Sequence, residues 1–260
     1  MLPRSFSGKV NLAVGAFLLA GIAMALAGAA RAEPDCSSGP APGNNWSKCT
    51  KMFLQLSGDD MTGLVARDAQ LTSNDFSHAR LAGADLRGSD LSNSRFDKAD
   101  LTGAKLSRIV GWRTGFVGAQ LDKVDFTYAD LSRVDFSGAS LKGANFEKSE
   151  VNRSDFSRAD LAGSDMSRAE VARVIFDNAD LTGVSFVYAN LARAAFGAAR
   201  LGGNDFTGAY FFRTQIGGAD LTKAKGLTQE QVNIACGSGQ TRLPAGLVAP
   251  KSWPCASEED

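Results

Sequence analysis

The chain has 260 residues, 44 % of them hydrophobic and 22 % charged, a composition that supports a sizeable core and argues against intrinsic disorder. Its 28 basic and 28 acidic residues balance, which excludes both the basic excess of a nucleic-acid binder and the acidic excess of a DNA mimic. Twenty-eight glycines beside seven prolines and a single histidine are typical of a repeat protein.

The first 32 residues have the pattern of a targeting segment. Two basic residues precede an almost wholly apolar stretch at 11–30, and Ala30-Arg31-Ala32 fits the small-x-small rule for signal-peptide cleavage. We therefore expect a signal peptide at 1–32, cleaved near Ala32, and a periplasmic or secreted protein with no stable membrane insertion after cleavage. A retained membrane anchor is the alternative, because about 20 apolar residues can span a bilayer.

The four cysteines agree with export to an oxidising compartment. They form two local groups, Cys36 with Cys49 and Cys236 with Cys255. Three connectivities are possible in principle, and we predict the disulfides Cys36–Cys49 and Cys236–Cys255 because a long rigid element separates the groups. The spacing does not match paired metal ligands of the CxxC type, so no metal site is expected.

A five-residue period runs through the middle of the chain. From Leu71 to Leu221 every fifth residue is large and apolar at 30 of 31 positions, and two residues before each of these the residue is small at 24 of 31. Neither an α-helix nor a plain strand has this period. The backbone must therefore turn a corner every five residues, with one large and one small side chain pointing inward on each side.

The period of five is nested in a period of twenty. One column of every twentieth residue, from Leu81 to Leu221, is all leucine, and another, from Phe76 to Phe196, is all phenylalanine before it ends in Ile216. Four sides of five residues make one coil, and successive coils should stack ~4.8 Å apart with parallel pairing. We expect an all-β solenoid of about eight coils at 51–225, after a cysteine-containing segment at 33–50.

The repeated five-residue motif, as in Ala99-Asp100-Leu101-Thr102-Gly103, resembles the pentapeptide-repeat family over more than half of the chain. The resemblance implies a right-handed quadrilateral parallel β-helix. The flanks, Trp46-Ser47-Lys48-Cys49 and the Gly226 exit, look like those of exported bacterial members. Family rods can dimerise end to end, so the resemblance leaves a homodimer open, although a disulfide-pinned cap would cover the C-terminal end.

One defect interrupts the interior pattern, where Ile109-Val110-Gly111-Trp112-Arg113 places glycine at a centre position. We interpret it as a local bulge in which Ile109, large for its small slot, compensates for the missing side chain. A surface notch for a partner is the alternative.

The residues after the repeats, 226–260, are predicted to form a cap and tail. Thr228 can act as N-cap with Gln231 three residues later, which is a capping box. A short capping helix at about Gln229–Ala235 should therefore cover the last coil.

One outward column is uniformly basic, and it is the best candidate for a partner-binding site. Its guanidinium groups should stand about 5 Å apart over ~25 Å. Outward aromatic residues lie near both ends of the column. Arginine and aromatic side chains together suit a polyanion or a protein partner. The candidate partner-binding residues are Arg113, Arg133, Arg153, Arg173, Arg193, Arg213, Trp112, Tyr210 and Phe212.

The alternative interpretation of this column is a solubilising ladder of arginine–carboxylate pairs. Asp130, Glu150 and Glu170 each precede an arginine of the column by three residues and offer partners on the same side. A second outward column interleaves Tyr128 and Tyr188 with basic residues, and carries less weight because single surface tyrosines are common.

Catalysis finds little support in the sequence. His78 is the only histidine, at an outward position, and no nucleophile elbow, phosphate-cradling loop or metal-ligand cluster occurs. We expect no enzyme and no cofactor. The leading hypothesis is an exported, non-catalytic binding or scaffold module that presents the arginine column to an unknown protein or anionic polymer.

Two alternatives remain. A purely structural rod without a discrete ligand would have the arginine column neutralised along its whole length. A DNA-mimicking gyrase binder, the role of quinolone-resistance members of the resembled family, is disfavoured by the export signal and the nearly neutral charge. No nucleic-acid partner is expected.

Overall fold

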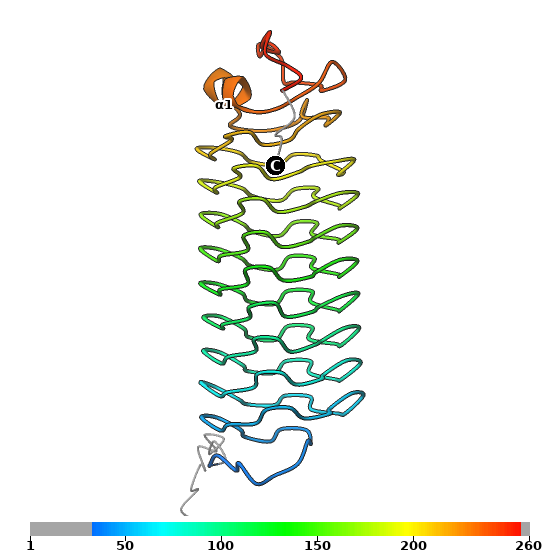
Figure 1. Cartoon of the computed structure of the whole chain (residues 1–260), viewed down its shortest axis with the longest axis vertical. Coiled ribbons are helices and arrows are strands. Elements are labelled where there is room, and N and C mark those ends of the chain that lie inside the picture. The colour runs from blue at the N-terminus through cyan, green and yellow to red at the C-terminus, as the bar shows by residue number, and fades with distance from the viewer. Residues whose placement is uncertain (1–32, 256–260) are drawn as a thin grey trace, which may run out of the picture. The chain divides into compact units, whose positions relative to one another are not determined.

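The computed structural model describes residues 33–255, so the signal peptide predicted at 1–32 lies outside the described residues. The chain divides into two units, Met1–Arg31 and Ala32–Asp260, and the second contains the described part. Figure 1 shows this part as a stack of similar coils with one short helix, α1 (Gln229–Ile234), beyond the last coils.

Neighbouring coils are joined by parallel bridges between residues that are 20 apart. The bridges begin with Asn45↔Val65, and from there to Asp205↔Lys225 the pairing follows the 20-residue period of the sequence; the last two, Gln215↔Cys236 and Asp220↔Arg242, join the final coil to the cap and tail with a longer spacing. The amide of Leu101 donates to the carbonyl of Gln120 at 2.8 Å, and the amide of Gln120 donates to the carbonyl of Ala99 at 2.9 Å. Within residues 33–255 no paired segment is longer than one residue, so each side of a coil contributes one bridging residue and is otherwise a turn.

Most corners are turns closed by a backbone hydrogen bond, with one residue in the left-handed region. At a representative corner the amide of Ala79 donates to the carbonyl of Phe76 at 3.0 Å, while His78 between them has a φ of 59°. A positive φ at the third position is the mark of a type II β-turn, where glycine is favoured. Glycine fills this position at Gly103, for example, but many corners carry long polar side chains there instead.

The interior is filled by columns of stacked side chains. Phe136 stacks on Phe156 with ring centroids 4.6 Å apart and an interplanar angle of 16°, and meets Phe126 of the adjoining side edge-on at 5.9 Å. All of these rings are fully buried. Each buried phenylalanine contributes roughly 1.5–3 kcal/mol of hydrophobic stabilisation before the entropy of ordering is subtracted. The large apolar residue of each repeat therefore holds one coil on the next.

The bulge expected around Gly111 does not occur. The bridges Asp90↔Val110 and Val110↔Asp130 keep the regular 20-residue register through this coil. A Cβ on Gly111 would lie 2.9 Å from a methyl carbon of Leu131, and Ile109 is buried, so neighbouring side chains occupy the space that glycine leaves. Repacking of the interior, and not a backbone distortion, compensates for the missing side chain.

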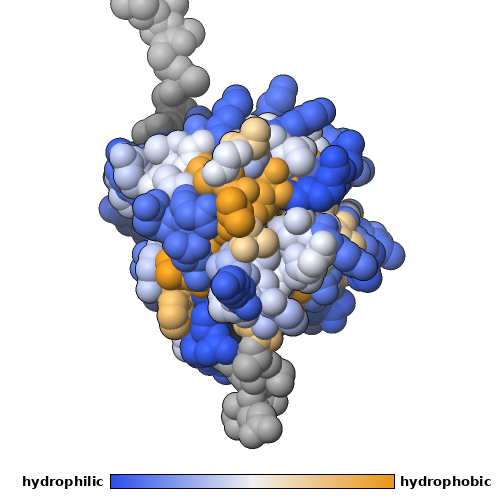
Figure 2. All heavy atoms as spheres, turned by 90° about the horizontal axis from the view of Figure 1, so that it is seen from above, coloured by the Kyte–Doolittle hydropathy of each residue, from blue (hydrophilic) through white to orange (hydrophobic). Residues whose placement is uncertain are grey.

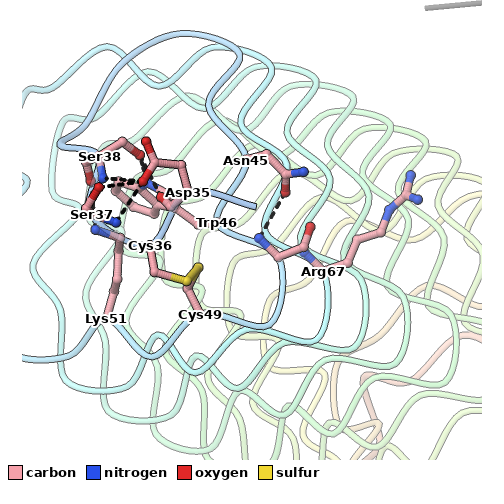
Figure 3. The surroundings of a disulfide bond; sticks show 10 residues. Asp35, Cys36, Ser37, Ser38, Asn45, Trp46, Cys49, Lys51 and Arg67 are labelled. Atoms are coloured by element: carbon pink, nitrogen blue, oxygen red, sulfur yellow. Dashed lines mark hydrogen bonds between the residues drawn. A yellow bond between two sulfur atoms is a disulfide. The ribbon is translucent and has the colours of Figure 1, made fainter. Parts of the chain in front are cut away.

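At the N-terminal end the pairing begins at Asn45, six residues before the predicted start of the solenoid at 51. A disulfide joins Cys36 to Cys49, as the sequence predicts (Figure 3). Trp46 is fully buried, and its indole donates to the hydroxyl of Ser38 at 3.0 Å. The cysteine-containing segment thus contributes to the first coil and closes its interior.

At the C-terminal end α1 spans Gln229–Ile234, one residue shorter than the predicted helix. The capping box is present, because the Thr228 side chain accepts from the amide of Gln231 and the Gln231 side chain accepts from the amide of Thr228. The Gln231 side-chain amide also donates to the carbonyls of Phe206 and Ala209, at 2.9 and 2.7 Å, which joins α1 to the coil beneath it.

The tail after α1 returns over the same end. A disulfide joins Cys236 to Cys255, again as predicted, and the Trp253 indole donates to the carbonyl of Ala235 at 2.8 Å. Figure 2, which looks onto this end, shows an apolar patch surrounded by polar side chains. Among residues 33–255 no helix is both long and apolar enough to cross a membrane.

Candidate functional site

The arginine column lies on one side of the coils, at the left-handed position of successive turns. Its six arginines have φ values between 55° and 63°, where a residue with a Cβ is less favourable than glycine by about 1 kcal/mol. We call this side the Arg face. Its outward residues are the arginine column, the column from Val110 to Tyr210 and the column from Trp112 to Phe212.

The first four arginines of the column, from Arg113 to Arg173, are exposed. Among residues 33–255, none of these four guanidinium groups has a carboxylate oxygen within the 4.0 Å that defines an ion pair. Arg193 and Arg213 are half-buried and have interaction partners of their own. The predicted ladder, which paired Arg133, Arg153 and Arg173 with the acids three residues before them, is therefore wrong for these three arginines.

The acidic residues of the Arg face have other hydrogen-bond partners. The Asp130 carboxylate accepts from the amide of Ser132 at 3.2 Å, two residues on along the same turn. Such a local bond is the usual preference of aspartate in a turn. Glu170 accepts from the side-chain amide of Asn190 in the next coil at 2.7 Å. Local bonding of these acids explains why their spacing in the sequence does not produce ion pairs.

Trp112 is an exposed aromatic side chain at one end of the Arg face, and we call such an exposed aromatic group an aromatic step. Its side chain is 45 % exposed, and the guanidinium groups of Arg113 and Arg133 lie 5.6 and 5.8 Å from the indole centroid. Both distances are within the range of a cation–π interaction. The structure therefore brings together the indole and the first two arginines that the sequence proposed for one site.

Tyr210 and Phe212 form a second aromatic step, five coils away from Trp112. Their side chains are 52 % and 42 % exposed, and their rings stack with centroids 6.2 Å apart and an interplanar angle of 10°. The amide of Arg193 donates to the carbonyl of Phe212 at 2.9 Å, so this step adjoins the last arginines of the column. Exposed arginines thus lie between two exposed aromatic steps.

Separate ion pairs between neighbouring coils occur on the side opposite the Arg face. There Arg80 pairs with Asp60 at 2.7 Å, Arg242 pairs with Asp220 at 2.9 Å, and Arg200 pairs with Asp180. A hydrogen bond from the Arg80 guanidinium is the main reason that the pKa of Asp60 lies well below its usual range. The two opposite sides of the solenoid therefore differ: one has paired charges between coils, and the other has exposed arginines without such pairs.

In the second outward column, the polar and charged side chains around Tyr128 already have partners within the protein. The Lys148 ammonium donates to the Tyr128 hydroxyl at 2.7 Å and lies 4.9 Å from the ring centroid. This hydrogen bond is the main reason that the pKa of Lys148 is raised. Arg168 pairs with Glu147 at 3.2 Å, which neutralises the next cation of the column.

Features of a catalytic or metal site are scarce in the described part of the chain. His78, the single histidine, is exposed at a turn. Within residues 33–255 no group of three or more histidine, cysteine, aspartate and glutamate side chains is placed to hold a metal ion.

Comparison with protein families gives one match, to pentapeptide repeats, in eight copies. The matched residues are 69–108, 119–158, 154–188 and 189–225, which together make up more than half of the chain. No curated protein matches the chain.

Several solved structures resemble the chain. HetL, a pentapeptide repeat protein involved in heterocyst differentiation regulation in the cyanobacterium Nostoc, is 25 % identical with a TM-score of 0.51, over 80 % of this chain and 90 % of HetL. A pentapeptide repeat protein of the Arabidopsis thaliana thylakoid lumen is 29 % identical over 49 % of this chain and 81 % of that chain, with a TM-score of 0.36. QnrB1, a plasmid-mediated fluoroquinolone resistance protein, is 16 % identical over 76 % of this chain and 91 % of that chain, with a TM-score of 0.42.

The family match and the likeness to HetL imply a right-handed quadrilateral β-helix. The spacing of the parallel bridges, four five-residue sides per 20-residue step, agrees with this architecture.

Proposed function

Because the chain belongs to the pentapeptide-repeat family, whose repeats build a scaffold, we propose that it is an exported, non-catalytic binding module that presents the Arg face to an extended anionic partner. The partner is an acidic polymer or an acidic segment of a protein. The binding residues are the exposed arginines from Arg113 to Arg173, with Trp112 at one end and the Tyr210–Phe212 step at the other.

The observation that carries the proposal is that the four exposed arginines, from Arg113 to Arg173, form no ion pair with any of residues 33–255. These arginines form an unbroken row of like charges without ion pairs at left-handed positions, where glycine would be more stable. Exposed cations at the same turn position on other sides, such as Lys98 and Arg158, stand singly in their column and form no such row. The opposite side of the same coils pairs its charges across coils, so the fold permits neutralisation where it is favoured. The four exposed arginines, from Arg113 to Arg173, therefore have the hydrogen-bond donors that a carboxylate or phosphate would use.

The spacing of the arginines bears on the kind of partner. Stacked coils repeat every ~4.8 Å, whereas the side chains on one face of a β-strand repeat every ~6.6 Å. A rigid strand would therefore fall out of step with the arginines after two or three coils. A flexible chain of acidic groups can follow the column, which favours an anionic polymer or an unstructured acidic segment.

The export part of the proposal rests on two observations. The segment 1–32 has the pattern of a signal peptide, and both ends of the described part are closed by disulfides, Cys36–Cys49 and Cys236–Cys255. Disulfides persist in oxidising compartments such as the bacterial periplasm or the medium. A homodimer formed end to end is compatible with this arrangement and is not required by it.

Binding of fluorescent polygalacturonate and poly-glutamate to the oxidised protein tests the proposal. The test variant carries glutamine at Arg133, Arg153 and Arg173, and should lose most of its affinity. A matched control changes three exposed cations that occupy the same turn position on other sides. The control carries glutamine at Lys98, Lys123 and Arg158.

Both variants lose three positive charges and keep a long side chain at each left-handed position, so their stability should match. Binding that falls equally in both variants would indicate a response to net charge alone, against a defined face. If neither polymer binds and periplasmic extract yields no partner that depends on the three arginines, the structural-rod alternative replaces the proposal. A DNA-mimic role is not proposed, because the Arg face is cationic and the chain as a whole is close to neutral.

A further inference from the structure

A hollow lies on the side of the coils that directly precedes the Arg face. It has a volume of about 220 Å³ and is lined by Arg67, Asp68, Arg87, Gly88, Ser107 and Arg108. Its origin is a missing side chain. Asp68, Gly88 and Arg108 succeed one another at the same turn position of three coils, and only Gly88, with a φ of 70°, has no side chain there. We call this hollow the Gly88 notch.

Two guanidinium groups of the notch are held in place by one buried carboxylate. Asp85 is only 7 % exposed. The Arg87 guanidinium donates to both of its oxygens, at 2.8 Å each, and the Arg67 guanidinium donates to Oδ2 from Nε at 2.7 Å and also from Nη2. Burial raises the pKa of Asp85, but the bonds from the two arginines outweigh it and hold this pKa below its usual range. Both guanidinium groups are therefore immobilised before any ligand arrives.

The way in which Asp85 holds these arginines leaves donors available. Among the described residues, no hydrogen bond uses Nη1 of Arg67 or of Arg87. Arg108 is exposed and, within residues 33–255, forms no ion pair; its guanidinium lies 5.9 Å from the ring centroid of Tyr128. Three guanidinium groups thus line one small hollow.

One acceptor belongs to the same hollow. A Cβ on Gly88 would lie 2.3 Å from Oδ1 of Asp68, so this carboxylate extends over the backbone of Gly88. With Asp85 counted, three positive and two negative groups surround the notch, which leaves one positive charge uncompensated. An anion alone would meet the Asp68 carboxylate unfavourably, whereas a ligand that also carries a hydroxyl group could donate to it.

We propose that the Gly88 notch binds a small hydroxylated organic anion, such as a sugar acid or a sugar phosphate. Its carboxylate or phosphate accepts from Arg87, Arg108 and Arg67, and a hydroxyl group donates to Asp68. The volume of the notch lies below the ~300–1,000 Å³ of pockets for drug-sized ligands, so the ligand is of about the size of one sugar. This site shares no residue with the Arg face and does not depend on the proposed function.

Calorimetric titration of the oxidised full chain with D-glucuronate, D-glucose and inorganic phosphate tests the proposal. We expect glucuronate to bind, phosphate to compete with it more weakly, and neutral glucose not to bind. Arg108→Gln should weaken glucuronate binding by about tenfold or more, because it removes a charged hydrogen-bond donor. Arg158→Gln, which removes another exposed arginine at the same turn position on a different side, should leave binding unchanged.

A second variant separates shape from charge. Gly88→Asn keeps every charge of the notch and fills it with a side chain that tolerates a positive φ, as Asn93 and Asn178 do elsewhere in the solenoid. The Asp68 side chain can shift to admit it. Binding should be lost in Gly88→Asn while its circular dichroism and thermal midpoint stay close to those of the unmodified protein.

The contribution of the Asp68 carboxylate can be separated from that of the arginines of the notch. Asp68→Asn should tighten phosphate binding and reduce the preference for glucuronate over phosphate. The proposal is overturned if the unmodified protein binds no glucuronate at millimolar concentration, if glucose binds as well as glucuronate, or if Gly88→Asn retains full affinity.

Discussion

Replacing Arg153 by glycine tests whether the arginine column is kept for binding or for stability. Arg153 has a φ of 61°, is exposed, and makes no side-chain hydrogen bond or ion pair with any of residues 33–255. A left-handed conformation costs a residue with a Cβ about 1–2 kcal/mol, and glycine avoids this cost. Glycine in turn loses about 0.5–1 kcal/mol more backbone entropy on folding. The net expectation is a gain of roughly 0.5–1 kcal/mol in the free energy of unfolding.

Thermal unfolding followed by circular dichroism measures this gain. For a chain of this size, 1 kcal/mol corresponds to a shift of about 2–4 °C in the midpoint, so Arg153→Gly should raise the midpoint by about 1–4 °C. Arg153→Ala is the control, because alanine keeps the Cβ and should not produce the gain. A fall in the midpoint of Arg153→Gly would refute the reasoning, since it would mean that the arginine stabilises the coil. A gain in stability together with a loss of polygalacturonate binding would show that the two properties oppose each other at this position.

Three other changes have expected outcomes. Phe136→Ala should cost about 3–5 kcal/mol, because it opens a cavity in the middle of the ring stack, and limited proteolysis should then cut near residue 136. Cys236→Ser should remove roughly 3 kcal/mol of tail stabilisation by opening the loop to Cys255, detected as early proteolysis of 238–255 while the coils stay protected. Because the pKa of Asp85 is depressed below its usual value of about 4, its contribution to the free energy of unfolding is present above about pH 4 and declines progressively as the pH falls from there toward the depressed value. Asp85→Asn should therefore flatten the acid limb of the urea midpoint measured between about pH 2 and pH 7.

Most of the fold could be predicted because the same physical choice is repeated in every side of every coil. A single apolar residue at a five-residue spacing is uninformative, but a column such as that from Phe76 to Phe196 has few explanations other than stacked coils. The capping box at Thr228 was predictable for a different reason, since it depends only on residues close together in sequence. Local and periodic signals need no knowledge of the surrounding packing.

The predictions that were wrong concern contacts between neighbouring coils. The pairing of Glu170 with an arginine was inferred from a spacing of three residues, but its carboxylate bonds to Asn190 of the next coil. The bulge at Gly111 was inferred from the loss of one side chain, but Leu131 of the next coil fills the space. In both cases a residue 20 positions further on decided the outcome.

The Gly88 notch could not be recognised in the sequence by inspection of any one column. It requires Gly88 in one column, two arginines in a second and Asp85 in a third, and each of these residue types is ordinary at its position. The available signal was the cluster Asp85-Leu86-Arg87-Gly88 one coil after Arg67-Asp68, read as neighbours in space once the period of 20 is known.

The 20-residue register also makes the solenoid a molecular ruler. Because each coil adds one step of ~4.8 Å, the five coils between Trp112 and Phe212 place the two aromatic steps ~24 Å apart. Duplication or deletion of one 20-residue unit would lengthen or shorten this distance by a single step and leave every column aligned. A change of five or ten residues would instead rotate all later side chains to a different side. The reach of the Arg face can therefore evolve in whole coils, while its chemistry stays the same.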